Sequence, residues 1–133
     1  RRARGLRDAR DRAHRSRHTG AGADLSLVKL RLLGSGSGYV GILSAELHLP
    51  ENRSLKGKRK ELLSVKAQLQ RRFGASVAEV DHHDLWQRSR LTLSCVARGY
   101  REVEELLDGA ERYLAGQAFE LGRVERDVVT LDD

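Results

Sequence analysis

The sequence predicts an α+β domain with the ferredoxin-like fold, in which a four-stranded antiparallel sheet carries two helices on one face. Residues 39–133 alternate between the two-residue apolar period of half-buried strands and the 3.6-residue period of amphipathic helices. These segments follow one another as β-α-β-β-α-β, and turn-forming or helix-ending residues such as Pro50 and Gly74 separate them. The length of 133 residues allows one such domain with an appendage.

The first strand and the first helix are predicted from apolar spacing. In the strand, apolar side chains fall on the odd positions Leu43, Ala45, Leu47 and Leu49, with polar residues between them. Pro50 ends this strand. Ser54 is the predicted N-cap of the helix, and Gly74 stops it. One helical stripe contains Leu55, Leu62, Val65, Leu69 and Phe73.

The remaining elements follow the same two periods. Short strands are predicted over residues 75–81 and 90–97, joined as a hairpin through "HHDLWQ". A second amphipathic helix covers residues 100–116 and has acidic residues in its first turn, where the helix dipole favours them. The last strand covers residues 119–129, and we expect a bulge at Gly122 because the apolar phase slips there.

This topology leaves the second face of the sheet open. The residues predicted to line it form a mildly apolar surface, which favours a homodimer that pairs the two sheets. They are Val40, Ile42, Thr92, Ser94 and Val96. Packing of residues 25–33 on the same face is the alternative.

An appendage of different composition precedes the domain. Residues 1–38 have ten Lys/Arg against three Asp/Glu, a net of +7, whereas residues 39–133 have 15 against 16, a net of −1. Residues 1–24 contain a single Leu among arginines and small residues, and "GSGSG" precedes the domain, so we predict that residues 1–38 are a disordered basic tail and linker. Its origin stays open between a phosphate-binding arm and a segment foreign to the native protein. Without a signal peptide or an apolar membrane span, and with Cys95 as the single cysteine, we expect a cytoplasmic protein.

The first helix concentrates positive charge. Residues 53–72 have eight Lys/Arg against one Glu, a net of +7. Cations crowd its first turns, where the helix dipole disfavours them, and a bound anion such as phosphate would relieve the repulsion. The predicted phosphate- or RNA-binding residues are Arg53, Lys56, Lys58, Arg59, Lys60 and Arg71. The alternative is a solvated helix face that pairs with the domain's own carboxylates.

The stretch "VAEVDHHDLWQR" could be mistaken for a metal or catalytic centre. Consecutive strand side chains point to opposite faces, so His82 and His83 are expected to diverge, and we predict no metal and no cofactor. In our interpretation Asp81 and Asp84 cap backbone groups and the Trp86 ring packs at the hairpin end. The possible secondary cluster is Asp81, His82, Asp84, Trp86 and Arg88. An enzyme that uses four of these, without Trp86, is our third hypothesis.

Two motifs make the chain similar to a known family. "RSLKGKRK" resembles R-S-L-K-x-K-R of the bacterial YlxP-like family, and "SVAEVDHHDLWQR" resembles its S-V-A-E-x-x-x-Q-D-x-W-Q-R, with His83 in place of Gln. The resemblance covers residues 39–128. It implies a ferredoxin-like domain without established catalytic activity, often encoded near ribosome-binding factor A and translation initiation factor two. It therefore implies a role in ribosome maturation or translation.

These observations predict a non-enzymatic binding protein. We expect its basic helix to dock on the phosphates of RNA or the ribosome. The rival hypothesis is a homodimeric protein-interaction module that does not contact RNA.

Overall fold

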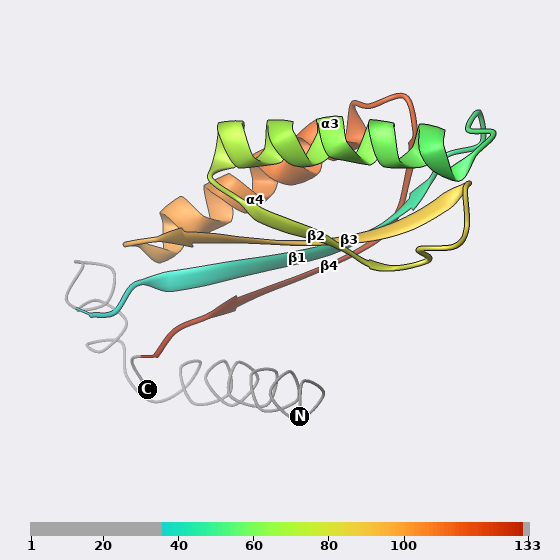
Figure 1. Ribbon diagram of the computed structural model, residues 1–133. Helices are drawn as coiled ribbons and strands as arrows, with labels where there is room; N and C mark the ends of the chain where they lie inside the picture. The colour runs from blue at the N-terminus through green and yellow to red at the C-terminus, as the bar shows by residue number, and fades with distance from the viewer. Residues whose placement is uncertain (1–35, 132–133) are drawn as a thin grey trace.

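The structure is a computed structural model that describes residues 36–131. Its elements are β1 (Tyr39–His48), α3 (Leu55–Phe73), β2 (Ser76–Asp81), β3 (Arg88–Ala97), α4 (Tyr100–Ala115) and β4 (Glu120–Val129). The strands form one sheet in the order β2-β3-β1-β4, and all neighbours are antiparallel. Both helices cover the same face of the sheet (Figure 1). The predicted ferredoxin-like fold is confirmed. The predictions for residues 1–35, including residues 25–33, lie outside the described residues.

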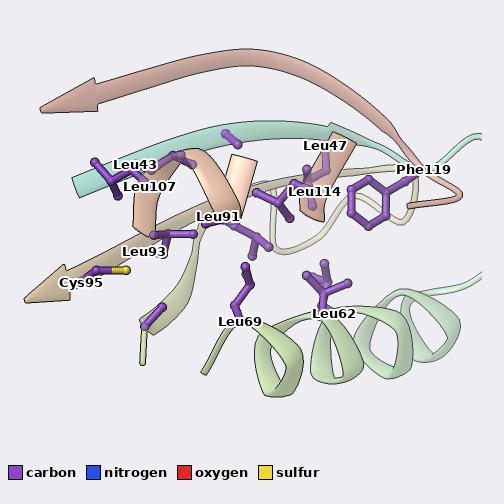
Figure 2. Packing of buried hydrophobic residues seen from close by; sticks show 14 of the residues in the cluster. Leu43, Leu47, Leu62, Leu69, Leu91, Leu93, Cys95, Leu107, Leu114 and Phe119 are labelled. Carbon is purple, nitrogen blue, oxygen red and sulfur yellow. The ribbon is translucent and has the colours of Figure 1, made fainter. Parts of the chain in front are cut away.

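The core lies between the sheet and the two helices. Figure 2 shows leucines from both layers meeting there, with Leu43 and Leu91 from the sheet and Leu69 and Leu107 from the helices. Gly41 lets α4 approach β1 closely, because a Cβ at this position would lie 2.5 Å from Cγ1 of Val103. The odd-numbered apolar residues of the first strand are buried, as its period predicts.

The ends of α3 are set by the residues that the sequence indicates. The Ser54 hydroxyl accepts a hydrogen bond from the Gly57 N–H at 2.9 Å, which makes Ser54 the N-cap. Gly74 ends the helix with a left-handed φ of 62°. The predicted bulge at Gly122 is also confirmed, since the β1–β4 register shifts between Ala45 and Leu47 opposite this part of β4.

The face of the sheet away from the helices has two different halves. Val40 pairs with Val96 and Ile42 with Ser94, so the predicted open-face residues do lie there. Val96 is 69% exposed. The other half is polar and contains Glu46 and Arg90, whose side chains form an ion pair at 2.9 Å. Within residues 36–131 no helix has the length and apolar character needed to cross a membrane.

Candidate nucleic-acid interface: a cationic helix face joined to the β2–β3 loop

A buried lysine joins α3 to the loop of residues 82–87, which connects β2 to β3. The Lys58 side chain is only 1% exposed. Its Nζ donates to the carbonyl oxygens of Leu85 at 2.6 Å and His82 at 2.7 Å. Longer contacts reach the carbonyls of Arg88 at 3.2 Å and His83 at 3.3 Å. Because an ammonium is well satisfied only by several acceptors, the loop carbonyls compensate much of the cost of burying this charge.

A carboxylate completes this arrangement, which we call the Lys58 cluster. Glu79 Oε2 lies 3.0 Å from Lys58 Nζ and accepts a hydrogen bond from the Ser89 hydroxyl at 2.7 Å. Burial by itself would raise the pKa of Glu79, but the hydrogen bonds from Ser89 and Lys58 and the nearby positive charge outweigh it. The pKa is therefore held below its ordinary value of 4.5.

The loop is also fastened to the start of α3 from outside. Asn52 Nδ2 donates both to the Ser54 carbonyl and to the Trp86 carbonyl. Gln87 Nε2 donates to the carbonyls of Pro50 and Asn52, each at 3.3 Å. Gly57 leaves room for this bridge, since a Cβ there would lie 2.6 Å from Asn52 Oδ1. The Asn52 side chain therefore links the backbone of Trp86 to Ser54, the N-cap of α3.

The position of Lys58 corrects one site prediction. We predicted that Lys58 contacts phosphate, but its ammonium is enclosed by protein oxygens and cannot reach an external ligand. Helical spacing could have predicted this burial. Lys58 lies four residues before Leu62 and seven before Val65, on the buried stripe of the helix. Lys58 does pair with one of the domain's own carboxylates, Glu79, as in the alternative prediction, but from a buried position and not from a solvated helix face.

The other predicted cations are exposed, and we call Arg53, Lys56, Arg59 and Lys60 the cationic face. The last three have i, i+3 and i+4 spacing, which places them side by side on the outer surface of α3. The structure does not bring Arg71 to them: it lies fifteen residues after Lys56, about 22 Å along the helix axis. Arg71 instead hydrogen-bonds Gln68 at 2.9 Å.

The cationic face has no carboxylate counterpart in the part of the chain that the structure describes. Within residues 36–131, Lys58 is the only basic side chain of α3 in an ion pair, and α3 has no acidic residue in its first turn. Leu63, which follows Arg59 by one turn, is 70% exposed on the same surface. The repulsion predicted from the sequence is therefore present in the folded domain, and an external anion would relieve it.

The structure brings only part of the secondary cluster together: His82 and Arg88 both contact Glu46, and Asp81 Oδ1 lies 3.8 Å from His82 Nδ1. Asp81 caps the loop as predicted, accepting from the His82 N–H at 2.7 Å. The His82 side chain turns toward the open sheet face, with Nε2 at 3.2 Å from Glu46 Oε2. Trp86 is 48% exposed, so its ring is less packed than expected, and Asp84 is exposed as well.

Glu46 organises the polar half of the open face. It pairs with Arg90 at 2.9 Å and with Arg88 at 3.6 Å, in addition to His82. The hydrogen bond to Glu46 raises the pKa of the Arg90 guanidinium above its ordinary value. No three His, Cys, Asp or Glu side chains converge as a metal-binding group in residues 36–131. This network was not predicted, because Glu46 and Arg90 are neighbours only through the β1–β3 register.

The family model described as "Protein of unknown function (DUF503)" matches residues 40–126. No curated protein matches the chain. Among solved structures, a designed protein titled "De novo designed protein Ferredog-Diesel" is 22% identical, with a TM-score of 0.37. That match covers 68% of this chain and 85% of the designed chain.

Proposed function

Since the chain belongs to the DUF503 family, described as proteins of unknown function, we propose a function from the site itself: non-enzymatic binding of RNA phosphates. The cationic face, which has no ion-pair partner within residues 36–131, is the observation that supports this proposal. Four basic side chains stand on or beside the first two turns of α3, where stability alone would favour acids. Phosphates supply the matching charge, and their contacts require no particular base sequence.

We also propose the cellular setting that the motifs imply. "RSLKGKRK" contains the whole cationic face, and the second motif contains the loop fastened to the start of α3, so the two motifs meet at one surface. This supports a YlxP-like protein that acts on RNA or the ribosome in the cytoplasm, in ribosome maturation or translation. The RNA contact is made through phosphates, without catalysis.

Salt-dependent binding of an RNA hairpin by the full chain tests the proposal. We expect the logarithm of the affinity to fall linearly with the logarithm of salt concentration. A Lys56→Glu, Lys60→Glu variant should bind more weakly, and its slope should be shallower by about 2, one for each lost phosphate contact. The control variant is Arg98→Glu, Arg101→Glu, which makes the same charge change at exposed positions past the far end of β3. Equal loss in both variants, or in neither, would reject the cationic face as the binding surface.

A homodimeric interaction module is the second candidate, favoured by the exposure of Val96 on the open face. Sedimentation of the same preparations at increasing concentration measures it. A dimer that loses RNA-independent association when Ile42 is replaced by Lys supports the pairing of the two sheets. A monomer at all concentrations rejects it.

A further inference from the structure

The loop of residues 82–87 exposes apolar side chains while its backbone is held in place. Trp86 is 48% exposed and Leu85 44% exposed. On the inner side, the Leu85 carbonyl accepts from Lys58 and the Leu85 N–H donates to the His82 carbonyl at 3.1 Å. The Trp86 carbonyl accepts from Asn52. A large ring on a fixed backbone loses little conformational freedom on binding, since only its two side-chain torsions are ordered.

The position of Trp86 relative to the cationic face gives the ring a specific use. The Asn52 side chain donates to the carbonyls of Ser54 and Trp86. The backbone of Trp86 therefore lies beside the start of α3, next to the segment that contains Arg53. Aromatic rings beside cationic side chains bind single-stranded nucleic acid, because bases stack on the ring while phosphates contact the cations. Asp84 is an exposed acid in the same loop, and its charge disfavours a phosphate close to the loop.

We propose that Trp86 is a stacking platform for an unpaired RNA base, whose flanking phosphates lie on the cationic face. The proposal rests on the proposed function and names its ligand class as single-stranded RNA. Bases of a double helix are already stacked on one another, so a duplex cannot offer one to the ring. Stacking requires a π-face and not a particular base, so the site tolerates sequence.

Fluorescence provides a local signal, because Trp86 is the chain's single tryptophan. The full chain is titrated with an eight-residue oligoadenylate, with a G·C-rich RNA duplex of the same length, and with inorganic polyphosphate. Oligoadenylate should quench the Trp86 emission at the concentrations where it binds. Polyphosphate supplies charge without bases, so it should bind without quenching, and the duplex should quench little.

Variants separate stacking from charge. Trp86→Ala should lower the affinity for oligoadenylate about ten-fold and leave that for polyphosphate unchanged, whereas Trp86→Phe should retain most of it. Asp84→Asn should raise the affinity for both ligands. Quenching is measured on the wild-type chain, so it decides the matter even where a variant folds poorly.

The outcomes distinguish this proposal from the one on which it rests. Salt-dependent binding of oligoadenylate and polyphosphate without quenching, unaffected by Trp86→Ala, overturns the stacking platform and leaves phosphate binding in place. Binding of neither ligand overturns both. A Trp86-dependent protein complex in the absence of RNA binding also overturns both, and assigns the ring to a protein partner.

Discussion

The two helices lie on the same sheet but use their charged residues differently. On α4, acidic side chains of the helix surround Arg126 of β4, which contacts Asp108 at 2.7 Å and Glu104 at 3.4 Å. On α3, a basic side chain, Lys58, is buried together with the apolar side chains that face the core. Its exposed cations have no ion-pair partner within residues 36–131. These acids of α4 thus have a basic partner within the domain, whereas the exposed cations of α3 have none in the described residues and are available to a ligand.

Among the substitutions that test this difference between buried and exposed charge, removal of the Lys58 ammonium should lower the stability of the domain most. Lys58→Met removes the counter-charge of Glu79 and the donor to several loop carbonyls, and we expect the free energy of unfolding to fall by about 3 to 5 kcal/mol. Urea denaturation measures the loss. Lys60→Met, an equivalent change on the exposed side of the same helix, should cost less than about 0.5 kcal/mol. Similar losses in the two variants would show that the buried lysine is not a structural link.

The next largest expected effect of Lys58→Met is a change in how the stability of the domain depends on pH. In the wild type the Glu79 pKa is lowered, so its stabilising contribution is complete above the unfolded pKa near 4.5 and is lost as pH falls through the folded pKa. Without Lys58, the effect of burial is opposed by fewer groups, and the pKa of Glu79 rises. Protonation then relieves the unpaired charge at a higher pH.

We therefore expect the stability difference between wild type and Lys58→Met to shrink as pH falls from 7 to 4. Urea denaturation at both pH values measures it, and the difference between wild type and Lys60→Met should not change with pH. A constant Lys58→Met deficit would mean that Glu79 is not the group left unpaired.

The smallest expected effect is that of a charge reversal in the first turn of each helix, which should stabilise the domain in α3 and destabilise it in α4. Lys56→Glu places an acid in the first turn of α3 and should raise the free energy of unfolding by about 0.3 to 1 kcal/mol. Glu102→Lys, the mirror change in the first turn of α4, should lower it by a similar amount. Thermal unfolding at low salt detects both. Destabilisation by Lys56→Glu would indicate that Lys56 already has a favourable partner in the full chain.

The fold was predictable because local periods decide it. The burial of Leu43 and Leu47 follows from alternation, and Ser54 and Gly74 mark the ends of α3 by their own backbone chemistry. The burial of Lys58 was predictable as well, since it shares the stripe of Leu62, but a charged residue is normally assigned to solvent.

The contacts that assemble the candidate site were not predictable in this way. Asn52 and Trp86 are 34 residues apart, and Lys58 contacts the loop through backbone carbonyls, which leave no trace in side-chain pattern. Glu46 and Arg90 meet across two strands, so their pairing depends on a register that the sequence does not state. The exposed cations of α3 required no such information, because helical spacing and composition place them.

His82 is the only non-glycine residue with a positive φ in the described chain, at 64°. Its carbonyl turns inward to Lys58 while its imidazole reaches Glu46 on the opposite side of the sheet. A single residue thus contacts both the buried lysine of α3 and the ion-pair network on the face of the sheet away from the helices. Asparagine tolerates the same backbone geometry but is too short to keep the Glu46 contact, so His82→Asn would remove this link while leaving the Lys58 hydrogen bond and the Glu46–Arg90 ion pair in place.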